Sequence, residues 1–285
     1  TRVRSSAASD VYKRQVLGIV GSNGGGKSTL LRIMSGVFDP DKGEVNINGI
    51  NILDNPSVKG ECFFIPDYPY FSNSSTLENT AFLFRSLYPN WNENAFKQFC
   101  SVFPIDPDAR IIDMSKGMQR QAALILALST CPRYLLLDEI FDGLDPVVRK
   151  LVKKIIIDNV SANDMTVVVA SHNLRELEEL CDRICLMHKG KLLLEREIDE
   201  IKLGLRKVQV AFTEVPDNSF FNEINVINTW RNGNIFNLTI KGTEEEFMPK
   251  LQELNPIYIS AVPMTLEEIF ICEMGVAGYD TENIL

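Results

Sequence analysis

The chain has 285 residues, of which 45% are hydrophobic and 24% charged, a composition typical of a folded globular protein. Its formal net charge of -9 argues against non-specific binding to nucleic acid or anionic lipid. Apolar runs such as AALILAL (122–128) are far shorter than the roughly 18–20 residues that cross a bilayer. We therefore expect no nucleic-acid partner and no membrane span in this sequence.

The first residues differ in character from those that follow. Residues 5–15 (SSAASDVYKRQ) have neither strand nor helix periodicity. Back-translated in one frame, this stretch spells a transposon adapter used to prepare sequencing libraries. We expect residues 1–15 to be a non-native segment fused to a truncated gene, with a natural polar tail as the alternative. Tyr12 is accordingly assigned no ligand role.

A phosphate-binding loop comes next. VLGIV (16–20) predicts a buried strand and KSTLLRIMSG (27–36) a helix, and GSNGGGKST, which joins them, matches G-x-x-x-x-G-K-[ST]. Consecutive glycines let backbone N–H groups turn inward around phosphate oxygens. Lys27 is expected to reach the β- and γ-phosphates, and Ser28 to bind Mg²⁺. The expected nucleotide-binding residues are Gly21, Ser22, Asn23, Gly24, Gly25, Gly26, Lys27, Ser28 and Thr29.

Short strands and amphipathic helices are predicted after the loop. GEVNINGINIL (43–53) predicts a strand pair on the nucleotide side, and ECFFIP (61–66) predicts a strand. Apolar residues have helical spacing from Leu77 to Phe84 and again around residues 96–103. The aromatic residues of these helices either belong to the core or form a docking surface for a partner.

Two acidic residues end the next apolar strand, which is predicted over Tyr134 to Leu137. Asp138 is suited to hold Mg²⁺ through water, and Glu139 is suited to polarise an attacking water as a general base. The alternative is a pair of acids that merely caps a strand end.

Three further segments lie around this strand in a characteristic order. DMSKGMQRQ (113–121) precedes it, DGLD (142–145) follows it, and TVVVASHN (166–173) comes last. Together with the phosphate loop they resemble the nucleotide-binding subunit of ATP-binding cassette (ABC) transporters, and among these the ATPases of bacterial drug and antimicrobial-peptide exporters. The resemblance covers about residues 16–194. It implies an α/β fold with a P-loop NTPase core and a helical signature subdomain at about residues 76–130.

The resemblance also implies roles for single residues. Residues of the signature element MSKGM (114–118) would complete the ATP site of the opposite subunit: Ser115, Lys116, Gly117 and Met118. His172 would contact the γ-phosphate and the attacking water, and Asp145 would be the aspartate of the D-loop (residues 142–145). Asp67 stands where the family has a glutamine, and we expect it to bind Mg²⁺ through water.

Beyond about residue 194 the pattern changes to a small α+β domain, residues 195–285. KVQVAF (207–212), INVINTW (224–230) and NIFNLTIKG (234–242) predict strands, with RNGN (231–234) as a hairpin turn. TEEEFMPKLQEL (243–254) and TLEEIFICEM (265–274) predict helices. A stabilising appendage and a regulatory or dimer-contact role are both compatible with this pattern.

The resemblance as a whole implies an ATPase that uses ATP and Mg²⁺ and drives a separate membrane permease through ATP-dependent dimerisation. The second ATPase subunit is either identical or different, and the location is cytoplasmic, on the inner face of the membrane. The alternative is a soluble ABC-superfamily ATPase that is not coupled to transport and has a regulatory or ribosome-associated role.

Overall fold

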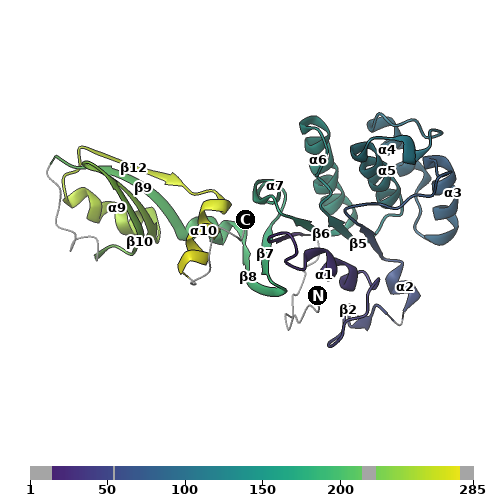
Figure 1. Cartoon of the computed structure of the whole chain (residues 1–285), viewed down its shortest axis with the longest axis horizontal. Helices are drawn as coiled ribbons and strands as arrows, with labels where there is room; N and C mark the ends of the chain where they lie inside the picture. Colours follow the sequence, from purple (N-terminus) through teal and green to yellow (C-terminus); the bar gives the residue numbers. More distant parts are fainter. Residues whose placement is uncertain (1–14, 54, 214–222, 277–285) are drawn as a thin grey trace. The chain divides into compact units, whose positions relative to one another are not determined.

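The computed structural model describes residues 15–53, 55–213 and 223–276, so the expectations about residues 1–14 lie outside the described residues. The chain forms two compact units that divide between Glu195 and Arg196. Figure 1 shows the helices and strands of each unit. Within the described ranges, no helix is both long and apolar enough to cross a membrane.

The first unit is built on a six-stranded sheet with the order β4-β5-β6-β1-β7-β8. Its strands are β4 (Cys62–Ile65), β5 (Tyr134–Asp138), β6 (Thr166–Ser171), β1 (Val16–Val20), β7 (Arg183–His188) and β8 (Lys191–Glu197). The neighbours from β4 to β7 pair in parallel. Every residue of β1 and β6 is buried, as expected for strands that helices cover on both faces.

The strand register brings three distant segments to one edge of this sheet. Val20 at the end of β1 pairs with Ser171 at the end of β6. Asp138 at the end of β5 pairs with Ala170. The phosphate loop, the two acids and His172 therefore all follow the carboxyl ends of adjacent parallel strands, where open α/β sheets bind their ligands.

The helices next to this edge begin at well-defined caps. Helix α1 (Lys27–Met34) packs on the sheet through Leu31, which is fully buried among residues of β1, β5 and β6. Helix α6 (Pro146–Asn163) begins at Asp145, whose side chain accepts from the backbone N–H groups of Val147 and Val148. The remaining short elements of this part are β2 (Asn46–Ile47), β3 (Ile50–Asn51), α2 (Pro56–Lys59) and α7 (Leu174–Glu178).

A group of helices, α3, α4 and α5, packs together near β4 (Figure 1). Its elements are α3 (Leu77–Leu87), α4 (Glu93–Val102), a 3₁₀ turn η1 (Ile111–Asp113) and α5 (Lys116–Ser129). Thr76 and Asn79 form a capping box at the start of α3, Asn92 caps α4, and Ser115 caps α5. The burial of α5 follows from the apolar run 122–128, in which every residue is buried.

The second unit contains a four-stranded sheet with the order β10-β11-β9-β12, paired antiparallel throughout. Its elements are α8 (Ile198–Gly204), β9 (Leu205–Ala211), β10 (Val226–Asn232), β11 (Ile235–Lys241), α9 (Glu244–Glu253), β12 (Tyr258–Pro263) and α10 (Leu266–Val276). Phe247 and Leu251 of α9 are buried in the same core as alternate residues of β9 and β11. The predicted hairpin turn is confirmed, since Asn232 pairs with Ile235. Strands β7, β8 and β12 were not predicted from the sequence.

Candidate functional site

The phosphate loop connects β1 to α1 and depends on glycine at two points. A Cβ on Gly21 would collide with the carbonyl oxygen of Met187. Gly26 has φ +102° and is the N-cap of α1, a conformation that other residues rarely adopt. Because no side chain of the described residues caps α1 and its first turn contains no acid, its N–H groups are suited to bind an anion.

The ammonium group of Lys27 lies inside this loop. The residue is 5% exposed, and its Nζ donates to the carbonyl oxygen of Gly21 at 2.7 Å. Nζ also lies 3.5 Å from Oε1 of Glu139. A buried ammonium requires such partners, so phosphate oxygens would have to replace these acceptors when a nucleotide binds.

A hydroxyl and a carboxylate face each other behind the loop. Ser28 Oγ donates to Asp138 Oδ1 at 3.1 Å. Within the described part of the chain, Asp138 Oδ2 is buried and has no hydrogen-bond partner. Burial raises the pKa of Asp138, the hydrogen bond from Ser28 lowers it, and the charges of Glu139 and Asp67 raise it further. The hydroxyl and the carboxylate together offer the hard oxygen ligands that Mg²⁺ prefers.

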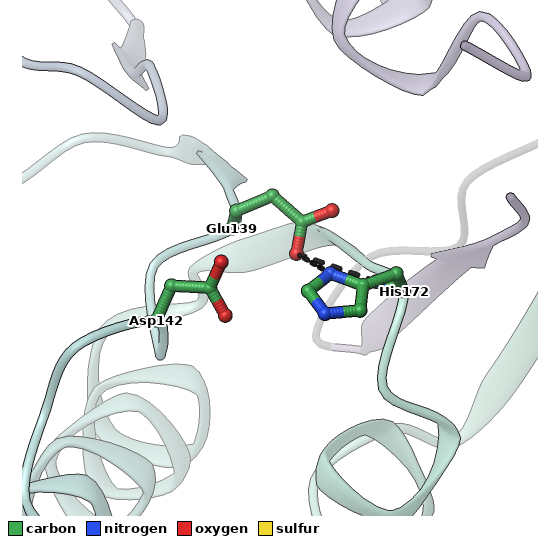
Figure 2. A group of neighbouring side chains, drawn as sticks. All are labelled: Glu139, Asp142 and His172. Atoms are coloured by element: carbon green, nitrogen blue, oxygen red, sulfur yellow. Dashed lines mark hydrogen bonds and ion pairs between the residues drawn. The ribbon is translucent and has the colours of Figure 1, made fainter. Parts of the chain in front are cut away.

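Glu139 and His172 contact each other directly (Figure 2). His172 Nδ1 lies 3.0 Å from Glu139 Oε2, and the backbone N–H of His172 donates to the same oxygen at 3.3 Å. Glu139 has φ +49°, so its backbone is left-handed, and its N–H donates to the carbonyl oxygen of Ala170 at 2.9 Å. Ligand atoms of Asp142, Glu139 and His172 lie within 4.8 Å of one another. The structure thus brings together the acid and the histidine that the sequence singled out for hydrolysis.

The signature element lies at the start of α5. Ser115 is exposed, and its Oγ accepts from the backbone N–H of Met118 at 3.2 Å. Lys116 is also exposed, and its ammonium lies 5.5 Å from the ring centroid of Tyr68. Among the described residues, no hydrogen bond or ion pair joins residues 114–118 to the phosphate loop of the same chain.

Comparison with known proteins identifies the family. Residues 5–142 match the family described as "ABC transporter". An ABC transporter ATP-binding protein, BpOF4_11395 of Alkalihalophilus pseudofirmus, is 30% identical over 195 residues, which are 66% of this chain and 71% of that protein. The chain belongs to the ABC transporter ATP-binding proteins. Members of this family hydrolyse ATP, so this ABC ATPase binds and hydrolyses ATP, and ABC ATP-binding subunits work together with membrane permease components.

The match to one further relative covers both units. The ABC transporter ATP-binding protein YtrB of Bacillus subtilis is 29% identical over 266 residues, covering 93% of this chain and 90% of YtrB. The Nod factor export ATP-binding protein I of Rhizobium meliloti is 28% identical over 210 residues, 69% of this chain and 61% of that protein. A solved ATP-binding subunit of an ABC transporter has the same fold, with a TM-score of 0.62 at 24% identity, over 67% of this chain and 81% of that one.

The position predicted for a further magnesium ligand has a different partner in this ABC ATPase. Oδ1 of Asp67 accepts from Nη2 of Arg120 at 2.5 Å, and the two side chains form an ion pair. The role of Asp67 at magnesium stays a prediction. Asp145, the predicted D-loop aspartate, uses its carboxylate to cap α6.

Sequence reasoning missed two arginines beside the D-loop. Arg120 donates to the backbone carbonyl of Asp142 and to Asp67. Arg149 donates to the carbonyl oxygen of Leu144 at 3.2 Å and lies 3.0 Å from Glu176. The available signal was weak. Arg120 lies two residues before the apolar run 122–128 of the same helix, and Glu176 lies four residues after His172.

Proposed function

We propose that this ABC ATPase powers an exporter by closing a head-to-tail dimer around two Mg²⁺-ATP molecules. The observation that carries the proposal is the exposed N-terminus of α5, where, among the described residues, no hydrogen bond or ion pair joins Ser115 or Lys116 to the phosphate loop of the same chain. Backbone N–H groups at a helix N-terminus, together with a nearby cation, suit the γ-phosphate of an ATP held by another subunit. The dimer partner is a second copy or a related ATPase.

Hydrolysis in this proposal depends on the pair at the ends of β5 and β6. Glu139 accepts the proton of the attacking water, because its carboxylate lies at the sheet edge beside the phosphate loop. His172 orients that carboxylate through the contact at 3.0 Å. ATP closes the dimer only to the extent that it binds the closed state more tightly than the open one. Loss of the γ-phosphate then lets the dimer reopen.

Magnesium fits the pair Ser28 and Asp138, since a buried carboxylate oxygen without a partner lies beside a hydroxyl. When bound there, the cation would neutralise negative charge on the phosphates. Lys27 and the N–H groups of α1 would hold the phosphates themselves.

Replacing Asp138 with asparagine is expected to stabilise the nucleotide-free protein at pH 7. The pKa of Asp138 is higher in the folded protein than in the unfolded chain. Between these two pKa values the native state binds more protons than the unfolded state, so the free energy of unfolding falls as pH rises through this range. Above this pH range Asp138 is ionised in the folded protein, and burial of its charge lowers the free energy of unfolding by the full amount. Asparagine removes this cost, and each 1 kcal/mol gained raises Tm by about 2–4 °C.

The same variant should lose much of the further stabilisation that Mg²⁺ and ATP give the native protein, because a neutral amide with one oxygen replaces the charged carboxylate. Thermal unfolding with and without Mg²⁺-ATP measures both effects. Asp106→Asn, at an exposed aspartate, serves as the control. An asparagine variant that is less stable without ligand, or that Mg²⁺-ATP still stabilises fully, would contradict the assignment.

A permease partner at the inner face of the membrane is supported by an apolar surface on α3. Phe82, Leu83 and Leu87 are 74%, 51% and 62% exposed. Apolar side chains that lie together on a surface mark an interaction site more often than isolated ones do. Of the two interpretations of the aromatic residues in this region, exposure favours docking for Phe82, whereas Leu77 and Ala81 of the same helix belong to the core.

The direction of transport is proposed from the relative whose name specifies Nod factor export. The test is co-expression with a multi-span permease sought among the neighbouring genes, reconstitution into vesicles, and measurement of ATPase rate and of substrate movement. ATP-dependent loss of a drug-like substrate from the compartment that contains the ATPase is the expected result. An ATPase rate that the permease leaves unchanged would favour the alternative of an ABC ATPase not coupled to transport.

A further inference from the structure

The side chain of Arg120 is unusually enclosed for a guanidinium group. Only 7% of it is exposed, and it lies on the second turn of the signature helix α5. Its Nε is buried and has no hydrogen-bond partner within the described residues. A buried guanidinium needs a charged partner and several acceptors to offset the loss of water, so the groups that surround Arg120 determine where it can lie.

Those groups come from two other functional segments. Nη2 of Arg120 donates to the backbone carbonyl of Asp67 at 3.0 Å and to its carboxylate at 2.5 Å. Nη1 donates to the backbone carbonyl of Asp142, the first residue of the D-loop. The planar, forked guanidinium can serve both segments at once, which an ammonium cannot do with the same geometry.

Two glycines leave room for this contact of Arg120. A Cβ added to Gly143 would lie 3.3 Å from Nη1 of Arg120. A Cβ on Gly117 of the signature would lie 2.7 Å from the carbonyl oxygen of Gly143. The backbones of the signature helix and the D-loop of one chain therefore lie close together, and Arg120 forms its hydrogen bonds at this point.

We propose that Arg120 is a positioning residue that ties the D-loop and the segment after β4 to the signature helix, and that Asp67 serves Arg120 and not the metal. Asp67 supplies the counter-charge, and its side chain, 33% exposed, is the more accessible member of the pair. Arg120 in turn fixes the carbonyl of Asp142, three residues after Glu139. The contact thereby controls the position of the D-loop, which begins three residues after the hydrolytic acid.

The proposal uses hydrolysis as one readout and so rests in part on the proposed function, but its first test needs no nucleotide. Hydrogen exchange is measured on the nucleotide-free protein for Asp67→Asn, Arg120→Gln and the double variant. Leu144 N–H donates to the carbonyl of Phe141 at 3.2 Å, a local turn bond that depends on the loop's position. We expect exchange in residues 142–145 to accelerate about tenfold or more in each variant.

The second test is the ATPase rate of the same proteins at a series of Mg²⁺ concentrations. Both single variants should lower kcat by a similar factor, about tenfold, and the double variant should be no worse than either single one, since all three break one contact. The Mg²⁺ concentration for half-maximal rate should stay within about twofold of the native value.

The control is Arg85→Gln, which breaks a comparable ion pair with Glu93 (2.8 Å) between α3 and α4. It should change neither D-loop exchange nor the Mg²⁺ dependence. Should Arg120→Gln fail to fold, Arg120→Lys keeps the charge, and Asp67→Asn alone decides the exchange experiment. Unchanged exchange at residues 142–145, together with a tenfold or greater rise in the Mg²⁺ requirement of Asp67→Asn, would overturn the proposal and assign Asp67 to the metal.

Discussion

Glu139→Gln is expected to lower kcat for ATP hydrolysis by about 10²–10⁴-fold, the usual contribution of a general base. Glutamine keeps the shape of the side chain but cannot accept the proton of the attacking water. ATP binding should persist or tighten, because Oε1 of Glu139 now lies 3.5 Å from the ammonium of Lys27 and competes with phosphate for it. Phosphate release measures the first effect, and binding of a fluorescent ATP analogue measures the second.

Asp142→Asn provides the comparison for this result. Its carboxylate belongs to the same cluster (Figure 2), but it does not contact His172 through any hydrogen bond between described residues. A much smaller fall in kcat is expected than for Glu139→Gln. If the glutamine variant releases phosphate at the native rate, Glu139 is not the base.

Ser115→Arg is expected to prevent the ATP-driven dimer, raising its Kd by at least about 30-fold, the effect of losing an interface residue worth about 2 kcal/mol. The long side chain would fill the space in front of the exposed N–H groups of α5, where the γ-phosphate of the opposite subunit is proposed to bind. The measurement is size-exclusion chromatography with light scattering in ATP. A Glu139→Gln background prevents turnover during the run.

Ser115 also caps α5, so the substitution removes a hydrogen bond to Met118 and lowers helix stability by about 1 kcal/mol. Asn92→Arg is the matched control, because Asn92 caps α4 in the same group of helices through the N–H of Ala95. This control should lose a similar amount of stability and still dimerise. An Asn92 variant that also stays monomeric would show that loss of a cap, and not a blocked interface, explains the first result.

The elements with strong local signals were predicted correctly from the sequence. VLGIV became β1 at the predicted residues, and TVVVAS became β6. Helix α9 has the threonine capping box that its sequence indicated, with Thr243 as the N-cap. Strands β7 and β8 were missed because their residues, interrupted by a lysine-glycine turn, lack a clear alternation, and because β7 is held by pairing with the distant strand β1.

The sequence by itself determined the chemistry of the phosphate loop and the identity of the two acids. These signals are local: a strand, glycines, a lysine and a helix start within a few residues of one another. The partners of those groups were decided by tertiary structure. Ser28 meets Asp138, 110 positions away, and Asp67 meets Arg120, 53 positions away. Such pairs depend on the order and register of parallel strands and on helix packing, which local patterns do not specify. For this reason the sequence did not indicate the ion pair between Asp67 and Arg120.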